Sequence, residues 1–591
     1  MSQTGHQAAA RERRVWLPAL VLLLLGLALY LPWLGASGLW DPWEPRYAQA
    51  AREMAASDNW IVPQYRLGPR LNKPPVTYWL IGLSQSVFGV NETAARLPSA
   101  LLAVLSSVML GLAFAIGGRP MEGFVAGAAL LTGPQWLLLG RFATPNMPLA
   151  SLLGIALALV LLLPSVESPR QKRVVQLAIV VSVAAAALTE WPRGILLPAW
   201  GVLGWGALRW GFKGPAGLVA VAAVYHAGQL GYSTPLNVAS FALAALLVGW
   251  ILHVRGGFAP RTLVIGALLL FLLVAPWFLF AYRLEPDGMK IWTYKHTWNL
   301  GESIQQHTGP YIYVVRILAL GALPWTAAAV IGLIAGIRFR KDGMAGILAG
   351  TGIGMTLFFT LSEAQMGHFY VVMQPALAAL AGIGVLSLFR RLDWSVVPAV
   401  ATMAAVWFIA WRHPSRILET ATVKRGLFGM ELSVVVSGVV LAWVLVLVAA
   451  RLRGRESWAL ASIVPALFLA GTLAFRVVPE LEPKKSLRPM WTRYLEHREE
   501  GQPIGAVGLA KDSGFYYSDN AIVRLKRSDE IRAFLSGPGV KYLIGTSGAL
   551  ERPTRWFPGH CEWLDRSHAT HRLVRCEPSD DPIRSPSAPA R

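Results

Sequence analysis

The sequence predicts a polytopic α-helical membrane protein that ends in a small soluble α/β domain. About 15 apolar stretches of membrane-spanning length run along its 591 residues. Only 15% of the residues are charged, whereas soluble domains carry roughly 25%. The composition becomes that of a soluble module after about residue 478. We therefore expect a membrane domain over 1–477, a soluble domain over 478–578 and a disordered, Pro- and Ser-rich tail over 579–591.

A helical span needs roughly 20 apolar residues, and the candidates meet that length to different degrees. Those between residues 193 and 253 are the weakest, so about thirteen spans is the alternative count. The spans are expected at residues 15–34, 93–116, 120–140, 145–164, 173–190, 193–211, 215–231, 235–253, 262–282, 311–336, 343–361, 369–389, 394–411, 430–450 and 457–476.

The distribution of positive charge predicts the orientation. With the N-terminus inside, every inward connection carries Lys or Arg, as the positive-inside rule requires, and only the outward loop over 412–425 departs from it. The same rule accounts for the net charge of +21, so we expect membrane lipids and no nucleic acid as partners. An odd span count places the loop 35–92, the loop 282–310, the turn 362–368 and the C-terminal domain on one outer face.

Two amphipathic segments of the first loop are expected to form helices in the plane of the membrane interface. The segment beginning at Arg46 is rich in helix formers, and residues 76–88 are apolar and aromatic but too short to span comfortably. The first loop is thus predicted to be structured.

The C-terminal domain is predicted to contain a strand–strand–helix–strand order. Residues 486–500 form a charged helix, 504–509 and 541–545 resemble buried strands, and 528–535 begin with a Ser-Asp-Glu helix start. Cys561 and Cys576 are the two cysteines of the chain. A pair in an exported domain is compatible with a disulfide, and no CxxC motif or histidine cluster accompanies it.

Two acids follow the first span, Asp41 and Glu44. Carboxylates and cations at the mouth of a helix bundle suggest chemistry, because lipid admits charge only at a cost. The alternative is a capping box, with Asp41 at the N-cap, Pro42 at the first helical position and Glu44 at N3. Pro45 fits that alternative poorly because it lacks an amide hydrogen. Capping and catalysis do not exclude each other.

Cations of the same outer side are candidates for binding an anionic lipid. Lys73 precedes the second amphipathic segment, and Arg46, Arg96 and Arg141 add positive charge. Each is equally compatible with a snorkelling anchor that reaches lipid headgroups. Three outer histidines, His296, His307 and His368, match no zinc spacing, and neither a phosphate-binding loop nor a dinucleotide fingerprint is present.

Several fragments resemble one known superfamily. They are Leu39-Trp40, Glu44-Pro45-Arg46-Tyr47, Leu71-Asn72-Lys73-Pro74-Pro75, Ala95-Arg96-Leu97-Pro98-Ser99, Arg141-Phe142-Ala143-Thr144 and Phe369-Tyr370. Together they resemble bacterial glycosyltransferases related to protein O-mannosyltransferases, and most of all the lipid A aminoarabinose transferases. The resemblance implies the multi-span GT-C fold and the transfer of a sugar from a polyprenyl-phosphate carrier to an outer-face acceptor.

The chain departs from the pattern of these relatives at four positions. Their adjacent Asp-Glu is Trp43-Glu44 here, and their second acid, after Arg-x-x-Thr, is Asn146. Their Lys-Gly-Pro is Glu190-Trp191-Pro192, and their Glu before Lys73 is Asn72, so the metal site of the aminoarabinose transferases is not reproduced.

These observations lead to one hypothesis with two alternatives. Asp41 first and Glu44 second would orient or deprotonate the acceptor, without a cofactor or a metal. The substrate-binding candidates are Arg46, Lys73, Tyr78, Arg141, Asn146, His296 and Tyr370. The donor is expected to be an undecaprenyl-phosphate sugar, and the acceptor a lipid, glycan or protein at the periplasmic face of a bacterial inner membrane. The alternatives are a lipid-linked sugar transporter and a catalytically degenerate scaffold.

Overall fold

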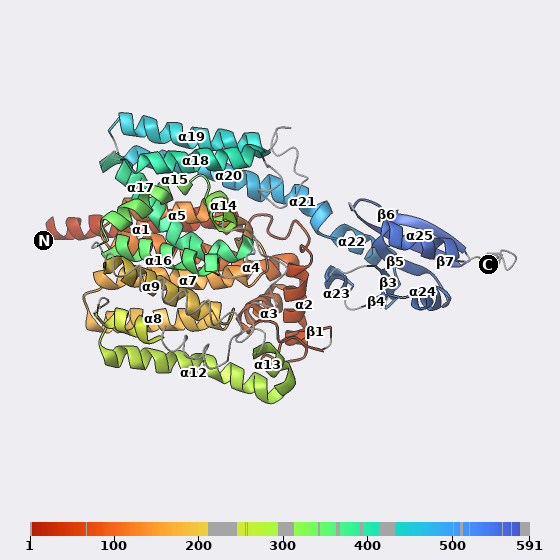
Figure 1. The fold of residues 1–591 in the computed structure, drawn as a ribbon. Helices are drawn as coiled ribbons and strands as arrows, with labels where there is room; N and C mark the ends of the chain where they lie inside the picture. Colours follow the sequence, from red (N-terminus) through yellow and green to blue (C-terminus); the bar gives the residue numbers. More distant parts are fainter. Residues whose placement is uncertain are drawn as a thin grey trace.

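The chain forms a helix bundle with a small sheet module at one end (Figure 1). The computed structural model describes residues 3–578 except 67, 211–244, 255, 257, 294–311, 341–342, 362–366, 391–393, 413–431, 455, 500, 509–511, 519–520, 558 and 569. Helix α1 (Gln3–Tyr30) begins at the end of the bundle opposite the module. The first loop, residues 35–92, lies at the end next to the module, here called the module-facing end (Figure 1).

The described part of the bundle contains seven helices that are long and apolar enough to cross a membrane, or eight if one bent pair counts as a span. Shorter apolar helices over Val15–Tyr30, Ala245–Val254, Thr326–Arg338 and Val396–Ala405 lie among them. The bundle elements are α1, α4 (Glu92–Ile116), α5 (Pro120–Thr132), α6 (Pro134–Gly140), α7 (Asn146–Leu162), η1 (Leu163–Ser165), α8 (Pro169–Ala187), α9 (Arg193–Arg209), α12 (Pro260–Leu284), α13 (Pro286–Thr293), α14 (Ile312–Gly321), α15 (Thr326–Arg338), α16 (Gly343–Leu361), η4 (Gly367–Met373), α17 (Gln374–Arg390), α18 (Val396–Arg412), α19 (Leu432–Leu452), η6 (Glu456–Ser462), α20 (Ile463–Thr472), η7 (Leu473–Val477) and α21 (Val478–Lys485).

Most predicted spans coincide with these helices, but two are interrupted. The span predicted over 311–336 is divided into α14 and α15, because Pro324 lies between them and cannot donate a helical hydrogen bond. The span predicted over 120–140 bends by 60° between α5 and α6, at Gly133-Pro134. The span predicted over 215–231, most of the one over 235–253 and the tail 579–591 lie outside the described residues.

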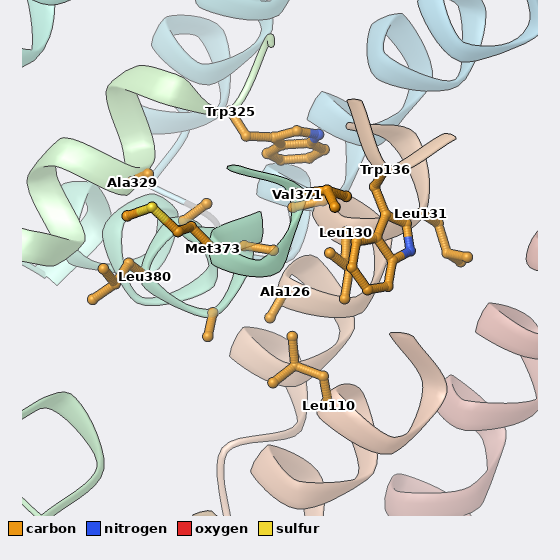
Figure 2. Packing of buried hydrophobic residues seen from close by; sticks show 14 of the residues in the cluster. Leu110, Ala126, Leu130, Leu131, Trp136, Trp325, Ala329, Val371, Met373 and Leu380 are labelled. Atoms are coloured by element: carbon orange, nitrogen blue, oxygen red, sulfur yellow. The ribbon is translucent and has the colours of Figure 1, made fainter. Parts of the chain in front are cut away.

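Large aromatic side chains fill the spaces between the bundle helices. Trp136 and Trp325 are 0% and 1% exposed, and both gather with Leu130 and Val371 in one cluster (Figure 2). Trp325 Nε1 donates to Thr132 Oγ1 at 2.9 Å, so the polar edge of this indole is satisfied inside the core.

Glycines let α15 and α17 touch backbone to backbone. A Cβ added at Gly384 would overlap the carbonyl oxygen of Ala328, and one at Gly332 would overlap that of Leu380. Small residues at helix contacts permit this close approach in membrane bundles, where apolar burial alone does not drive helices together.

The first loop folds as the sequence predicted, into α2 (Trp43–Ala56) and α3 (Val76–Phe88), with a short hairpin of β1 (Gln64–Tyr65) and β2 (Gly68–Pro69) between them. Ala48, Ala51 and Met54 of α2 pack against Tyr78 and Ile81 of α3. The orientation of these helices in the interface plane stays a prediction. The expected capping box is wrong, because α2 starts at Trp43 after Pro42 and has no side-chain cap.

The C-terminal module is a five-stranded mixed sheet in the order β4-β3-β5-β7-β6. Strand β3 pairs in parallel with β4 and with the central β5, whereas β7 pairs antiparallel with β5 and β6. The expected strand, strand, helix and strand are β3, β4, α24 and β5. The elements are α22 (Arg488–His497), β3 (Ile504–Val507), α23 (Ser513–Tyr517), β4 (Ile522–Leu525), α24 (Ser528–Leu535), β5 (Lys541–Thr546), α25 (Ser547–Trp556), β6 (Gly559–Asp565) and β7 (His571–Pro578).

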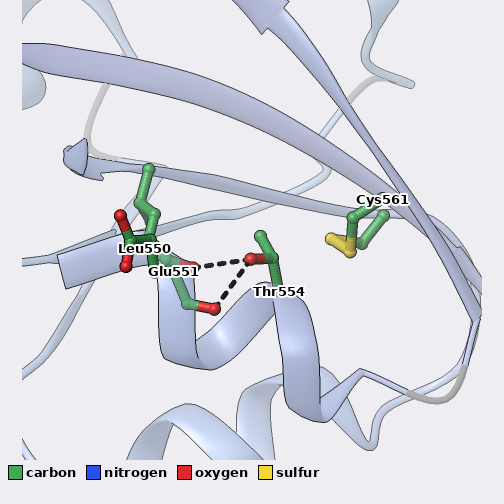
Figure 3. Close-up of a disulfide and its surroundings, with 5 residues drawn as sticks. Leu550, Glu551, Thr554 and Cys561 are labelled. Carbon is green, nitrogen blue, oxygen red and sulfur yellow. Dashed lines mark hydrogen bonds between the residues drawn. A yellow bond between two sulfur atoms is a disulfide. The ribbon is translucent and has the colours of Figure 1, made fainter. Parts of the chain in front are cut away.

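A disulfide joins the two outer antiparallel strands of the module. Cys561 on β6 and Cys576 on β7 are directly opposite each other in the ladder and are bonded. On the neighbouring helix α25, the hydroxyl of Thr554 donates to the carbonyl oxygens of Leu550 and Glu551 (Figure 3). The predicted fold class, a helical membrane bundle with a small α/β domain, is confirmed.

Replacing Gly384 by Ala tests the backbone contact between α15 and α17. We expect destabilisation by about 1–3 kcal/mol, because the methyl group must separate two packed helices. The measurement is the thermal unfolding of the purified protein in detergent. A methyl group added at Gly438 on α19 would meet only open space, so Gly438→Ala is the matched control. Equal melting temperatures for both variants would contradict the close packing.

Candidate active site at the module-facing end

A buried ion pair between Glu44 on α2 and Arg96 on α4 organises the first loop. Arg96 Nε donates to Glu44 Oε1 at 2.8 Å, and Arg96 Nη2 donates to Glu44 Oε2 at 2.7 Å. The backbone amides of Ala143 and Trp40 donate to the same two oxygens at 2.8 and 2.9 Å. Both charged residues are only 1% exposed. The carboxylate is therefore fully hydrogen-bonded and joins three separate segments of the chain.

The other nitrogens of Arg96 hold the end of the first predicted span. Its Nη1 donates to the carbonyl oxygens of Leu34 and Ser37, at 2.9 and 2.7 Å, and its Nη2 donates to that of Gly38 at 2.9 Å. Arg141 acts similarly on α1, because it donates to the carbonyl oxygens of Leu29, Tyr30 and Pro32. Arg141 thereby satisfies carbonyls that the end of α1 leaves without intrahelical partners, and Arg96 satisfies those of the segment that follows.

Asp41 faces the C-terminal module. Its Oδ1 accepts from the amide of Ser513 at 2.9 Å, and its Oδ2 accepts from the Ser513 hydroxyl at 2.5 Å. The predicted N-cap acid therefore binds the start of α23 in the module. It does not cap its own helix.

Asp512, next to Ser513, is a second junction between the module and the first loop. It accepts from Arg46 Nε at 3.0 Å, from Arg66 Nη2 at 2.6 Å and from the hydroxyl of Tyr65. Burial would raise the pKa of Asp512, but the Tyr65 hydrogen bond and the charges of Arg46 and Arg66 outweigh it and hold that pKa below its ordinary value. Asp512 is thus a charged anchor at neutral pH, and the candidate Arg46 is one of its partners.

A second charge cluster joins Lys73, just before α3, to the turn between α8 and α9. Lys73 Nζ and Arg193 Nη1 both contact Glu190 Oε1, the latter at 2.8 Å. The Lys73, Arg193 and Glu190 side chains are 18%, 13% and 2% exposed. The amide of Val76 donates to the carbonyl oxygen of Leu188 at 3.1 Å, which fixes the two segments together. Two cations therefore converge on one carboxylate oxygen.

Burial and the neighbouring charges shift the pKa values of Lys73 and Glu190 in this cluster. Burial lowers the pKa of Lys73, Arg193 acts in the same direction, and Glu190 opposes both. For Glu190, burial alone would raise the pKa, but Lys73 and Arg193 outweigh it and hold the pKa at about 2. Because this value lies below the ordinary value of about 4.3, the pair stabilises the fold above pH ~4.3 and loses that contribution as the pH falls toward 2.

Aromatic side chains surround the cluster. The Arg193 guanidinium lies 3.6 Å from the centre of the Phe369 ring, and His368 acts electrostatically on Glu190. The rings of His368 and Trp43 are 5.9 Å apart, and Arg46 lies 5.7 Å from the Trp43 ring. Segments from α2, the loop before α3, the α8–α9 turn and η4 therefore meet at one place.

The remaining candidates from the sequence are distributed around this place. Tyr78 is fully buried against Tyr47, with ring centres 5.6 Å apart, and Tyr370 is fully buried against Phe359. Asn146 is the first residue of α7 and is 9% exposed. The predicted His296, and with it His307, lies outside the described residues.

Sequence reasoning missed Glu190 and Arg193 as site residues, and also Asp512. A usable signal existed for the first two. The predicted span parity already put the 190–193 turn on the outer face, and two opposite charges in so short a turn between apolar helices are unusual. No local sequence pattern could have identified Asp512, because its partners are more than 440 residues away along the chain.

Comparisons with known proteins agree with this architecture. Residues 72–225 match the family described as dolichyl-phosphate-mannose-protein mannosyltransferase. The chain is 24% identical over 92% of its length to the undecaprenyl phosphate-alpha-4-amino-4-deoxy-L-arabinose arabinosyl transferase of Erwinia tasmaniensis, covering 91% of that protein. The corresponding protein of Pectobacterium carotovorum is 26% identical, over 91% of this chain and 88% of its own length.

A solved structure has the same fold. The crystal structure of ArnT from Cupriavidus metallidurans bound to undecaprenyl phosphate superposes with a TM-score of 0.66, at 19% identity, over 94% of this chain and 97% of that one. The class of the protein is thereby defined as a multi-pass membrane protein with the GT-C fold. In sequence and in fold the chain is similar to glycosyltransferases of the protein O-mannosyltransferase and lipid A aminoarabinose transferase superfamily, as its sequence motifs predicted.

Removing Glu44 tests the organising ion pair. We expect Glu44→Ala to destabilise the protein by about 3–5 kcal/mol, because it leaves Arg96 charged and buried without its partner. Thermal unfolding in detergent measures the effect. Glu480 on α21 forms an exposed pair with Arg476, so Glu480→Ala is the control and is expected to cost less than about 1 kcal/mol. A small effect at Glu44 would contradict the assigned role.

Neutralising Asp512 tests the junction between module and loop. We expect Asp512→Asn to increase amide hydrogen exchange in residues 43–66, because one charge no longer holds Arg46, Tyr65 and Arg66 together. Hydrogen exchange followed by mass spectrometry gives the readout. Asp529 in the same module is largely exposed, so Asp529→Asn serves as the matched control. Unchanged exchange in the loop of the Asp512 variant would refute the junction.

Proposed function

We propose that this glycosyltransferase takes its sugar from a polyprenyl-phosphate carrier of the undecaprenyl type. The observation that carries the proposal is the convergence of Lys73 and Arg193 on one oxygen, at the module-facing end of the bundle. Paired, partly accessible cations suit the phosphate of a lipid-linked sugar. The names of the arabinosyl transferase relatives and the undecaprenyl phosphate bound to ArnT support the same donor class.

In this proposal the protein stabilises the departing phosphate. Cleavage of the bond between the sugar and the carrier leaves a lipid phosphate that carries the additional negative charge. Lys73 and Arg193 would stabilise that charge, and such an interaction is strong in a partly dry site. Phe369 lies beside Arg193, and Trp43 lies beside Arg46 and His368, so both rings offer apolar surface to the sugar or the isoprenoid chain.

The contacts of the two predicted catalytic acids favour positioning roles. Glu44 has both oxygens occupied by Arg96 and two backbone amides, and Asp41 has both oxygens on Ser513. Neither can take a proton from an acceptor without giving up these contacts. We therefore propose that Glu44 shapes the first loop and that Asp41 attaches it to the module.

The proposed location is a bacterial inner membrane, with the N-terminus in the cytoplasm and the C-terminal module in the periplasm. Basic inward connections support this orientation, and so does the disulfide between Cys561 and Cys576, which suits an oxidising compartment. The acceptor would be a lipid such as lipid A, an envelope glycan or a protein at the periplasmic face.

Replacing Lys73 by Met tests the donor site. We expect weaker binding of undecaprenyl phosphate and a transfer rate lower by about 100-fold or more, because one of two phosphate-binding charges is lost. Binding is measured with the purified protein. Transfer is measured by mass spectrometry of lipid A and envelope proteins from a deletion strain complemented with each variant.

Lys290 provides the control for that experiment. It lies on α13 in an exposed pair with Asp287, so Lys290→Met removes a lysine charge away from the cluster. Normal binding and transfer are expected for this variant. Wild-type affinity for undecaprenyl phosphate in both Lys73→Met and Arg193→Ala would reject the proposed donor site.

A further inference from the structure

The acids Glu44, Asp41, Asp512 and Glu190 at the module-facing end differ in how their oxygens are used. Glu44, Asp41 and Asp512 have hydrogen-bond donors on both oxygens. Glu190 has two cations on Oε1, whereas its Oε2 has no hydrogen-bond partner among the residues that the structure describes. Among these four acids, Glu190 is therefore the one with an oxygen to which the described residues donate no hydrogen bond.

A bare carboxylate oxygen in a buried position is costly. Glu190 is 2% exposed, so bulk solvent reaches this oxygen far less than it would reach one at the surface. Buried polar atoms nearly always have a partner, and an exception calls for a functional explanation. A hydroxyl group of a bound substrate is the kind of donor that this oxygen lacks.

The neighbours of Glu190 suit a group that stays ionised and fixed. Lys73 and Arg193 restrain Oε1 from two sides, and Arg193 is itself restrained by the Phe369 ring. His368 and Trp43 contact each other next to this cluster. A carboxylate fixed in this way is preorganised to orient a hydroxyl group for attack.

We propose that Glu190 is the catalytic carboxylate that activates the acceptor and that the acceptor nucleophile is a hydroxyl group. Oε2 accepts the hydrogen bond of this hydroxyl while Oε1 stays on Lys73 and Arg193. The hydroxyl oxygen forms a bond to the anomeric carbon, the bond from that carbon to the phosphate oxygen breaks, and its electron pair remains on the phosphate. The hydroxyl proton passes to Glu190 and then to solvent. This inference rests on the proposed function.

The proposed role of Glu190 also limits the acceptor class. A carboxylate that receives a proton suits an acceptor hydroxyl, which must lose its proton on transfer, whereas an ionised phosphate oxygen has no proton to give up. The acceptor is therefore a sugar, lipid or protein hydroxyl, with an O-glycosidic product. A sugar attached through an acceptor phosphate would be the product of a different arrangement.

Glu190→Gln and Glu190→Asp test this role in the full-length protein. Gln keeps the size and an acceptor oxygen for Lys73 but removes the base. We expect Glu190→Gln to lose transfer by at least about 100-fold, with undecaprenyl phosphate binding within about threefold of wild type or tighter. Glu190→Asp keeps the charge and is expected to recover part of the transfer. Product is measured by mass spectrometry of the complemented deletion strain, normalised to membrane protein level.

The control is a carboxylate of equal burial in another ion pair. Glu122 on α5 is paired with Arg119 and Arg390, and its side chain is also 2% exposed. Glu122→Gln is expected to keep normal transfer. The inference is overturned if Glu190→Gln retains transfer, if it loses phosphate binding and thermal stability together, or if the product is linked through a phosphate. Failure of the proposed function looks different, because the wild type then neither binds undecaprenyl phosphate nor produces a sugar-modified acceptor.

Discussion

The need to neutralise buried charge determines the architecture of the module-facing end. Glu44 and Arg96 lie where neither water nor a flexible surface can stabilise them, so each must find every partner inside the protein. They do so by collecting the end of the first span, the start of α2 and the segment after α6 around one carboxylate. The first loop has a defined shape because these bonds cannot be made in another arrangement. The other charges of this end are then held at fixed positions relative to that loop.

Asp512 and Glu190 extend this principle to two further junctions with different consequences. Both oxygens of Asp512 accept hydrogen bonds from residues of the first loop, and these bonds attach the module to that loop. Glu190 is as deeply buried, but among the described residues it has partners on one oxygen only. The first arrangement is suited to stability and the second to binding. A buried carboxylate thus serves two purposes, and the number of its oxygens that accept hydrogen bonds distinguishes them.

The sequence predicted the parts of this structure that depend on local composition. The helices around Glu92–Ile116 and Val76–Phe88 follow from apolar length, and Lys73 stood out as a cation before an amphipathic helix. The pairing of these parts was not predictable in the same way. Lys73 and Glu190 are 117 residues apart, and Asp41 and Ser513 are 472 apart, so no local pattern connects them. The capping-box interpretation of Asp41 failed for this reason, because a distant donor competed successfully with the local one.

Two positions of this chain, Trp43 and Glu190, differ in charge from the superfamily pattern, and the two differences are compatible with each other. In that pattern the first loop has an acid where this chain has Trp43, and a later loop has a lysine where this chain has Glu190. A carboxylate at 43 would lie beside His368, and a lysine at 190 would add a third cation to Lys73 and Arg193. In this chain Glu190 gives the cluster a carboxylate and relieves the repulsion between Lys73 and Arg193. The α8–α9 turn thus carries an acid where the pattern that the sequence resembles has a cation.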